Sequence, residues 1–439
     1  MGSNAAARSQ LRSVVVHLAA VSLAATASAQ APTFTGLTDP FPGGYVDGVR
    51  AVNADGSVVV GYTYKPTFPD FGNRSFRWRR GIGFDDPGPT QGVTLSYAAG
   101  VSADGNVISG NTGHAQFGDQ EAWVRVGESR GHVGSPPGYD FSSLAGVSAN
   151  GVICAGWGGD QTNPNSAEAA SYDTSDDSWM NLGFLSGGSW SKALAASADG
   201  SVIVGVATDA NPMIYSRAIV WTTATGMQPV GGIGNLPDGI EAEAVGVSAD
   251  GSVIVGTDYV VDANYNSTLT AWRWTAATGM VPLATNFYVG GVSPDGQLIA
   301  GTDQSSGDNE PAIWDAAHGV RNLRSVLQAQ GLGAQIADWY MCCATAVNQS
   351  GSTYVIAGEG GDPAGYIAGW VVTLPSLDAP DCPGDLNGDL VVDLADLSAL
   401  LTNFGAGGGM TLADGDLDGD GDVDLADLSA LLERFGATC

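Results

Sequence analysis

One short pattern recurs along the chain, and it constrains the fold more than any other feature. It reads AVNADGSVVVG from Ala51 and GVSADGSVIVG from Gly246, and a degenerate copy, AVNQSGSTYVIAG, begins at Ala346. The remaining copies begin at Gly100, Gly146, Ala195 and Gly291. The turn glycines of successive copies lie 45 to 55 residues apart. Because a period of this length corresponds to one supersecondary unit, we expect an array of similar units.

Each copy of the pattern predicts a β-hairpin. An Asp-Gly or Asn-Gly pair separates two apolar stretches, which predicts a two-residue type I′ turn with positive φ at both positions. The runs SVVV and SVIV are β-branched and continuously apolar, so both of their faces are expected to be buried. We assign the turn aspartates to this structural role rather than to ligand contacts; they are Asp55, Asp104, Asp199, Asp250 and Asp295.

A third stretch with an aromatic residue and a short fourth stretch follow each hairpin. The aromatic residues are Trp78, Trp123, Tyr172, Trp221, Trp274, Trp314 and Trp370. Four strands in 45 to 50 residues are typical of a propeller blade, so the chain is predicted to be all-β with a seven-bladed β-propeller. The last unit lacks a clear fourth strand, and TFTGLTD from Thr33 is expected to supply it and close the ring. An open solenoid and an eight-bladed ring are the alternatives.

The N-terminal residues 1–29 have the features of a secretory signal peptide. Arg8 and Arg12 precede the apolar segment SVVVHLAAVSLAA, and Ala27-Ser28-Ala29 fits an A-x-A cleavage site. A membrane anchor or a misplaced start codon are the alternatives. The apolar segment is short for a membrane span, so we expect a secreted protein, extracellular or at the cell surface, without membrane insertion.

The charge of the chain restricts its partners. The formal net charge is −30, with Lys65 and Lys192 as the two lysines. Such a surface repels nucleic acid and anionic membranes, and it attracts cations. We therefore expect no nucleic-acid partner, and Ca²⁺ as the candidate cofactor.

Two acidic segments near the C-terminus match without a gap and begin 31 residues apart, at Asp385 and Asp416. Read as 12-residue loops, they present oxygen ligands at the spacing that Ca²⁺ requires, which predicts two calcium ions. The first loop offers Asp385, Asn387, Asp389, Asp393, Asp396 and the carbonyl of Val391. The second offers Asp416, Asp418, Asp420, Asp424, Asp427 and the carbonyl of Asp422. The first loop has Leu390 where the turn favours glycine and the second has Gly421, so the second loop is expected to bind more tightly.

A helix is predicted after each loop. Leu394, Leu397, Leu401 and Phe404 recur at helical spacing, and Leu425, Leu428, Leu432 and Phe435 repeat the pattern. A single short helix would be marginal alone, but two related helices can pack face to face. Val392 and Val423, at the eighth position of each loop, are expected to pair the loops or to reach the core.

Both parts of the chain resemble known families. The repeats, with their A-V-S-x-D-G-x-V-V-G pattern and G-M-x-x-L turns, resemble the HAF-type extracellular repeat family, which implies secretion and a propeller-like array over residues 30–374. The duplicated loop and helix at 385–439 resemble a type I dockerin, a small all-α EF-hand-like domain that binds cohesin modules and is held folded by two Ca²⁺ ions. Residues 375–384, with several prolines, form the linker between them. The dockerin-like helices lack the Lys and Arg usual on cohesin-binding surfaces.

The cysteines leave several pairings open. Cys382 and Cys439 bracket the acidic segments, and a disulfide between them would clamp the ends of that domain. Cys342 and Cys343 are adjacent; they could form a vicinal bridge, one could pair with Cys154, or all three could be thiols.

Signals of catalysis are weak. His114, His132 and His318 show no metal-ligand spacing, and no nucleophile or phosphate-binding motif is present. The sequence favours a secreted, non-catalytic propeller that binds a glycan or a surface protein and attaches to a cohesin-like scaffold. The segments that vary most between blades, such as YKPTFPDFGNRSF, are the candidate binding loops. A polysaccharide hydrolase or lyase with its active site in the propeller channel is the alternative, and a channel lined by small apolar residues would favour the binder.

Overall fold

The structure is a computed structural model. It describes residues 31–38, 44–65, 72–89, 95–113, 120–161, 163–210, 216–231, 241–261, 267–375, 377, 384–386, 391–408, 410, 414–418 and 420–437. The predicted signal peptide, the predicted disulfide Cys382–Cys439 and the predicted ligands Asn387 and Asp389 lie outside the described residues. No helix in the described ranges is long and apolar enough to span a membrane.

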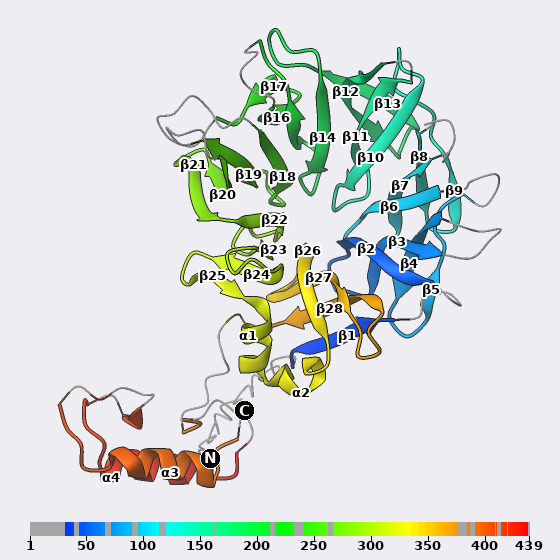
Figure 1. The fold of residues 1–439 in the computed structure, drawn as a ribbon. Coiled ribbons are helices and arrows are strands. Elements are labelled where there is room, and N and C mark those ends of the chain that lie inside the picture. Colours follow the sequence, from blue (N-terminus) through cyan, green and yellow to red (C-terminus); the bar gives the residue numbers. More distant parts are fainter. Residues whose placement is uncertain are drawn as a thin grey trace, which may run out of the picture. The chain divides into compact units, whose positions relative to one another are not determined.

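Seven four-stranded antiparallel sheets form the blades of a β-propeller around a common centre (Figure 1). Blade one is β2 (Tyr45–Val52), β3 (Val58–Lys65), β4 (Gly72–Arg79) and β5 (Gly83–Asp85), and blade two is β6 (Leu95–Val101), β7 (Val107–Gly113), β8 (Gln120–Val126) and β9 (Ser129–His132). Blade three is β10 (Phe141–Val147), β11 (Ile153–Asp160), β12 (Asn163–Asp173) and β13 (Ser178–Gly183), and blade four is β14 (Ser191–Ala196), β15 (Val202–Ala207), β16 (Arg217–Thr222) and β17 (Gly226–Pro229). Blade five is β18 (Ala242–Val247), β19 (Val253–Val261), β20 (Ser267–Thr275) and β21 (Gly279–Thr285), and blade six is β22 (Phe287–Val292), β23 (Ile299–Asp303), β24 (Glu310–Asp315) and β25 (Gly319–Asn322).

The seventh blade joins the two ends of the propeller. It contains β26 (Tyr340–Ser350), β27 (Thr353–Gly361) and β28 (Ile367–Leu374), and its fourth strand is β1 (Thr33–Leu37). Strand β1 pairs antiparallel with β28, from Thr33 opposite Thr373 to Leu37 opposite Gly369. The predictions of seven blades and of closure by the N-terminal strand are therefore confirmed.

A helical insert between blades six and seven was not predicted. It comprises α1 (Leu323–Leu327), the π-helical turn η1 (Gln328–Leu332) and α2 (Gly333–Ile336), and its leucines and Ile336 pack with blade seven. Trp339, which follows the insert, lies edge-on to Phe34 of β1, with ring centroids 5.1 Å apart. A Cβ atom on Gly36 would lie 2.1 Å from the Trp339 ring, so only glycine fits there. The insert thus holds the closing strand in place.

The repeated turn differs from the type I′ hairpin that we expected. Five residues separate β2 from β3, and among the described non-glycine residues only Asp177 and Asn286 have positive φ. The turn glycine is left-handed, as Gly251 is with φ +74°, but the preceding aspartate is not. The physical reason is side-chain bonding: Ser248 Oγ and the Ser252 backbone N–H both donate to Asp250 Oδ1, at 2.7 and 2.9 Å. This Asx-type network stabilises a longer turn.

The same side-chain network recurs around the ring and links the blades. The serine of the turn also accepts from the first residue of the next strand, as in Val253 N–H to Ser248 Oγ at 3.0 Å. Backbone hydrogen bonds connect the turns of blades one to six in succession, between positions 54 and 103, 103 and 149, 150 and 198, 198 and 249, and 249 and 294. Asn348 Nδ2 donates to the Val52 carbonyl at 3.0 Å and connects blade seven to blade one.

The last glycine of the repeated pattern makes room for the innermost strand. In every blade, a Cβ atom at this position would lie 1.9 to 2.2 Å from a backbone carbonyl oxygen of the innermost strand; the glycines are Gly61, Gly110, Gly156, Gly205, Gly256, Gly301 and Gly358. Each lies opposite a β-bulge in that strand. In three blades it also faces a fully buried tryptophan of the third strand, which is Trp123, Trp272 or Trp370.

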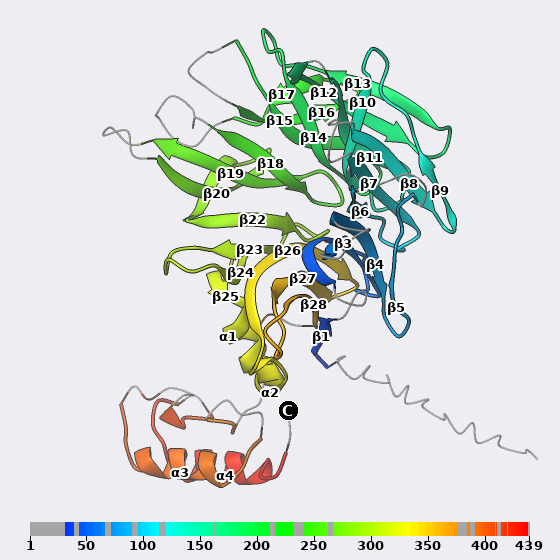
Figure 2. The same ribbon diagram turned by 45° about the vertical axis from the view of Figure 1, so that its right-hand side comes forward.

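The C-terminal module, by which we mean the described residues of 384–437, contains α3 (Leu394–Asn403) and α4 (Leu425–Glu433), which lie side by side (Figures 1 and 2). Asp393 and Asp424 cap the two helices with matching capping boxes. Val392 and Val423 reach the core, as expected, together with Leu400 and Leu431. The loops do not pair at these valines: Val423 bonds to residues 405 and 406 after α3, and Val392 bonds to residues 436 and 437 after α4.

The two helices contact each other, as expected, but most residues of their apolar stripes are exposed. Leu397 and Leu428 pack against the core, but Leu394 and Leu425 are each 72% exposed. The remaining stripe residues, Leu401, Phe404, Leu432 and Phe435, are also exposed. The buried core of the module consists of Leu400 and Leu431 from the helices and Val392 and Val423 from the loops.

Candidate functional site

The second acidic loop brings its carboxylates close together. Carboxylate oxygens of Asp416, Asp418 and Asp420 lie within 4.8 Å of one another, and those of Asp422, Asp424 and Asp427 form a second such group. One carboxylate oxygen of Asp422 is buried and has no hydrogen-bond partner among the described residues. An anionic oxygen left in this way is costly unless a cation compensates it.

The shape of this loop is fixed by two buried aspartates at its ends. The Asp427 carboxylate accepts from the backbone N–H groups of Leu417 at 2.7 Å and Asp424 at 2.7 Å. Asp416 Oδ2 accepts from the N–H of Gly421 at 2.9 Å, and Gly421 has the positive φ, +94°, that the sequence predicted for its position. These bonds fix the backbone of the loop, on which the carboxylates form the two groups described above.

The electrostatics of the loop favour a bound cation. Burial and then the neighbouring carboxylates, Asp420 first, raise the pKa of Asp418 and of Asp422. At Asp427, burial acts to raise the pKa, but the backbone hydrogen bonds outweigh it and the pKa is lowered. The loop therefore holds several ionised groups that repel one another, and a divalent cation would relieve this repulsion.

The first loop has the same closing geometry where it is described. Asp396, which is fully buried, accepts from Leu386 N–H at 2.7 Å and from Asp393 N–H at 2.8 Å, matching Asp427 in the second loop. The described part of this loop includes Asp385 at its first position and Val391 at its seventh. A set of carboxylate and carbonyl oxygens on a flexible loop suits Ca²⁺, so the donor chemistry of both loops fits that ion.

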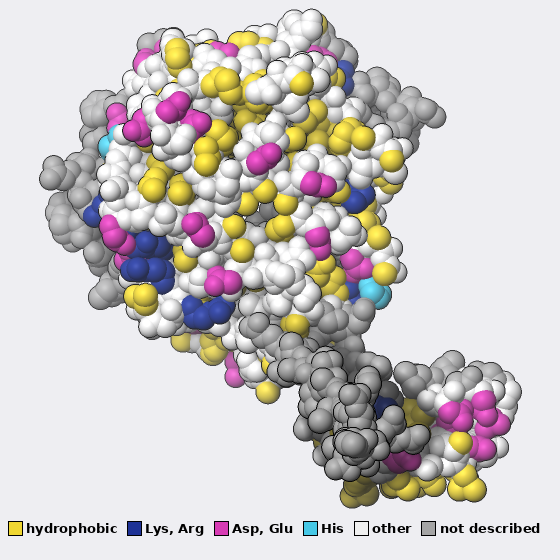
Figure 3. All heavy atoms as spheres, turned by 180° about the vertical axis from the view of Figure 1, so that it is seen from behind, with side chains coloured by type: hydrophobic (Ala, Val, Ile, Leu, Met, Phe, Trp, Pro, Cys, Tyr) yellow, Lys and Arg dark blue, Asp and Glu magenta, His cyan; other side chains and the backbone are white. Residues whose placement is uncertain are grey.

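The helices of the C-terminal module leave a duplicated apolar surface exposed. It consists of Leu394, Leu401 and Phe404 on and after α3, and Leu425, Leu432 and Phe435 on and after α4. Figure 3 shows hydrophobic side chains gathered along one edge of this module, apart from a group of acidic side chains. We call these six residues the paired apolar surface. Large apolar residues grouped in this way on a small domain mark an interaction surface.

The axis of the propeller is a narrow channel lined by small and aliphatic residues. The seven bulge residues of the innermost strands line it, and they are Arg50, Ala99, Ala145, Leu194, Val245, Gly290 and Thr345. Arg50 is the one charged residue among these seven equivalent positions. No pair of carboxylates lines this channel within the described residues.

One end of the channel widens into a hollow of about 500 Å³, which we call the mouth. Its lining includes Arg50, Tyr62, Tyr97, Asn111 and Trp157, from blades one, two and three. The Arg50 guanidinium lies 5.2 Å from the centroid of the Tyr62 ring and donates to its hydroxyl at 3.2 Å. The rings of Tyr62 and Tyr97 are 5.1 Å apart and edge-on. The mouth therefore combines aromatic faces with hydrogen-bonding groups.

A second cation lies beside the mouth. Lys192, on β14 of blade four, places its Nζ atom 4.6 Å from the centroid of the Trp157 ring and 5.0 Å from that of Trp190. Burial lowers the pKa of this lysine. Two acidic residues of other blades, Glu243 and Glu359, are half-buried, and burial raises the pKa of each. Glu359 Oε1 accepts from the Val49 N–H at 2.9 Å.

The sequence did not identify the mouth. Its aromatic residues and Arg50 lie on strands of different blades, and only the closed ring brings them together. The candidate loops proposed from sequence variability fall partly on residues 66–71, 162 and 262–266, outside the described residues. The sequence did contain one signal for the mouth. When the seven repeats are aligned, Arg50 is a charged residue at a position where the other six copies have neutral residues.

The described histidines lie away from this mouth. His132 Nδ1 lies 3.0 Å from Glu121 Oε2, and His318 Nδ1 lies 2.8 Å from Asp315 Oδ1. Both are on or beside the outer strands, and His114 lies outside the described residues. Cys154, Cys342 and Cys343 are free thiols, and Cys154 is buried in the core between blades two and three.

Comparisons with known proteins show the fold alone. No model of a known protein family matches the chain, and no curated protein matches its sequence. The β-propeller domain of the Trilobed protease from Pyrococcus furiosus is similar in structure, with a TM-score of 0.50 and 12% identity over 77% of this chain and 97% of that chain. An oligogalacturonate lyase in complex with manganese matches with a TM-score of 0.49 and 11% sequence identity, over 79% of this chain and 97% of that chain. TolB from Acinetobacter baumannii matches with a TM-score of 0.39 and 13% sequence identity, over 58% of this chain and 60% of that chain.

Proposed function

We propose that this chain is a secreted, non-catalytic propeller that binds a glycan, and that a calcium-stabilised, dockerin-like module attaches it to a cohesin-like scaffold. The docking role is supported mainly by the paired apolar surface of the module, whose two helices each follow one of the matched acidic loops. Each half of the module presents the same leucines and phenylalanine, at Leu394, Leu401 and Phe404 and at the positions 31 residues later. Burying six such side chains against a partner removes a large apolar area from water.

Calcium has a structural role in this proposal. The backbone bonds to Asp396 and Asp427 close the loops, and the clustered carboxylates then require a cation to offset their repulsion. Metal binding and folding of the module are therefore coupled. The resemblance to dockerins and the resemblance of the repeats to the HAF family both agree with an exported protein.

The propeller is proposed as a binder because of the residues along its axis. Small and aliphatic side chains line the channel, and aromatic residues with amide and guanidinium groups surround its mouth. Aromatic faces stack on sugar rings, and side-chain amides bond to hydroxyl groups. A hydrolase acting on glycosides would need two carboxyl groups at a set separation, and the described lining of the mouth contains none.

Two measurements test this function. The full chain is applied to immobilised cohesin in Ca²⁺ and in chelator, and capture is expected in Ca²⁺ alone. A variant with Leu401→Asp and Leu432→Asp should lose capture while it still binds Ca²⁺. The chain is also applied to a glycan array, with product analysis by mass spectrometry. Binding without cleavage supports the proposal; cleavage of a bound glycan would replace it by the hydrolase or lyase.

A further inference from the structure

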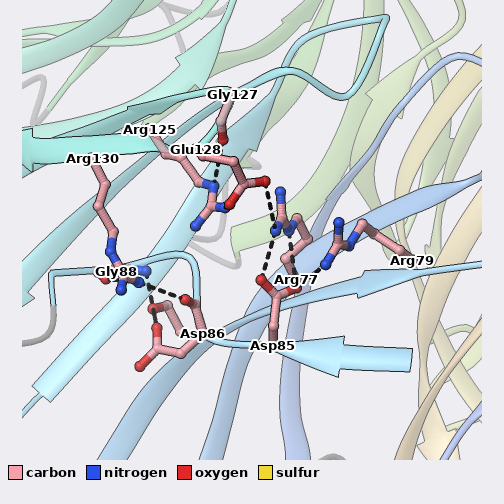
Figure 4. A network of polar contacts seen from close by, with 10 residues as sticks. Arg77, Arg79, Asp85, Asp86, Gly88, Arg125, Gly127, Glu128 and Arg130 are labelled. Carbon is pink, nitrogen blue, oxygen red and sulfur yellow. Dashed lines mark hydrogen bonds and ion pairs between the residues drawn. The ribbon is translucent and has the colours of Figure 1, made fainter. Parts of the chain in front are cut away.

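Most arginines of the described propeller have acidic side chains or backbone carbonyls as partners. Figure 4 shows a group of them between blades one and two. Arg77 Nη2 lies 2.6 Å from Asp85 Oδ2, and Arg125 Nη2 lies 2.5 Å from Glu128 Oε2. Arg130 donates to the carbonyl oxygens of Asp86 and Gly88, at 2.9 Å each. In a chain with a net charge of −30, such pairing of the few cations is expected.

Arg50 and Lys192 differ from this group. Each of these two cations lies over an aromatic ring: Arg50 over Tyr62, and Lys192 over Trp157 and Trp190. Cation–π contacts orient a cation without neutralising its charge. Arg50 is exposed and uses one donor, to the Tyr62 hydroxyl, so the other donors of its guanidinium point toward solvent.

Burial raises the pKa of Glu359, while the charge of Arg50 acts to lower it, so this carboxylate lies within electrostatic reach of the guanidinium. Glu359 Oε1 accepts from the Val49 backbone N–H, and Glu243 lies within hydrogen-bond distance of Thr257 Oγ1, at 3.5 Å. Both are half-buried. No acidic residue is among the described lining of the mouth, where Arg50 lies with Tyr62, Tyr97 and Trp157, and Lys192 contacts the Trp157 ring.

We propose that the mouth of the propeller binds an acidic sugar, with Arg50 and Lys192 contacting its carboxylate or sulfate group and the aromatic rings of Tyr62, Tyr97 and Trp157 stacking on its ring. This inference rests on the proposed glycan-binding function and names the class of glycan. A guanidinium recognises a carboxylate or sulfate through paired hydrogen bonds, and the neighbouring rings provide flat apolar faces. The amide of Asn111 is held in place by bonds to the Leu144 backbone, at 2.6 and 2.9 Å, and gives the mouth a rigid edge.

The negative charge of the whole chain is compatible with this site. Screening at physiological ionic strength limits charge effects to about 8 Å, so the cations at the mouth act on a ligand in contact with them. The overall charge disfavours long polyanions such as nucleic acid, which would extend over the acidic surface. A short acidic oligosaccharide seated in the mouth avoids that repulsion.

The test compares three probes on the full chain by isothermal titration calorimetry: an oligouronate, its carboxyl-reduced neutral counterpart, and a sulfated form of that neutral sugar. An acidic probe is expected to bind about tenfold or more tightly than the neutral one, and the difference should shrink as salt is added. The two acidic probes separate carboxylate from sulfate recognition. Arg50→Gln and Lys192→Met should each weaken the acidic probe by about tenfold and leave the neutral probe nearly unchanged.

Arg80→Gln is the matched control, because it removes the same charge at the turn end of blade one, where Arg80 donates to the Asp55 carbonyl. It should not change binding, and melting temperatures verify that all variants fold. Equal binding of acidic and neutral sugars, or unchanged affinity in both mouth variants, would overturn the acidic-sugar assignment and leave glycan binding intact. If no sugar on the array binds, both the acidic-sugar assignment and the proposed glycan-binding function are overturned.

Discussion

The turn aspartates stabilise the blades through bonds to one side-chain oxygen. Asp250 Oδ1 accepts from Ser248 Oγ, from Ser252 N–H and from Ser252 Oγ, at 2.7 to 2.9 Å. These bonds, with the Ser248 hydroxyl first, lower the pKa of Asp250 to about 2. The aspartate is exposed, so solvent screening reduces what this shift contributes to stability.

Asp250→Ala is expected to lower the free energy of unfolding by about 1 kcal/mol, because three hydrogen bonds to an exposed turn are lost. The folded-state pKa is lower than the unfolded one, so the contribution is present above about pH 4 and is lost as the pH falls toward 2. Chemical denaturation at pH 7 and pH 2.5 measures both effects. Asp308→Ala, at an exposed loop between β23 and β24, is the control; an equal loss in both variants would contradict this role.

The three described thiols are predicted to differ in reactivity. Burial raises the pKa of Cys154 to about 12. Cys343 Sγ donates to Cys342 Sγ at 2.9 Å, and this contact lowers the pKa of Cys343 and raises the pKa of Cys342. In reduced, folded protein at pH 8, iodoacetamide should modify Cys343 first and Cys154 only after unfolding, as followed by peptide mass spectrometry. Fast modification of Cys154 in the folded state would show that its burial is wrong.

At the scale of elements, the closing strand β1 should contribute strongly to stability. Leu37 is fully buried among residues of blades one and seven, whereas Thr33 is exposed at the other end of the strand. Leu37→Ala should destabilise the propeller by about 2 to 5 kcal/mol because it leaves a cavity, and Thr33→Ala should cost less than about 1 kcal/mol. Guanidinium unfolding followed by tryptophan fluorescence measures both. Similar small losses would show that the ring does not depend on this strand.

The helices of the C-terminal module should depend on Ca²⁺. Each is about ten residues long and their shared core is small, and the loop before α4 carries two groups of clustered carboxylates. A helix of this length is marginal in isolation. The fragment 381–439 should therefore be largely unfolded in chelator and gain helical circular dichroism as Ca²⁺ is added. Mg²⁺ at the same concentration is the control, since it accommodates fewer protein oxygens.

The sequence predicted elements that repeat locally, and it missed features that depend on several elements. The seven turn glycines and seven aromatic third strands predicted the blades, because each of these signals lies within one repeat unit. The segment from Thr33 predicted the closing strand, because the last unit lacks a fourth strand of its own. The turn type was wrong because Ser248 and Asp250 bond to the backbone in a way that Asp-Gly alone does not indicate. The spacing of the helical leucines did not show which of them are buried, because the core of the module also includes Val392 and Val423 from the loops.

At the scale of the whole molecule, the candidate sites are built in different ways. The proposed ligands of each acidic loop come from twelve consecutive residues, so the spacing in the sequence was enough to suggest them. The mouth takes Arg50, Tyr97 and Trp157 from three blades, and no local pattern in the sequence brings them together. The propeller and the C-terminal module can therefore be tested separately, because variants of the mouth leave the acidic loops intact.

Calcium binding by the full chain tests the central claim most directly. Isothermal titration of chelator-stripped protein is expected to give two bound Ca²⁺ ions per chain, the tighter one in the loop with Gly421. Asp416→Ala should remove the tighter site and Asp385→Ala the weaker one, while Asp308→Ala should leave both. A chain that shows no saturable Ca²⁺ binding, or whose binding is unaffected by loss of Asp416 and Asp385, would contradict the account.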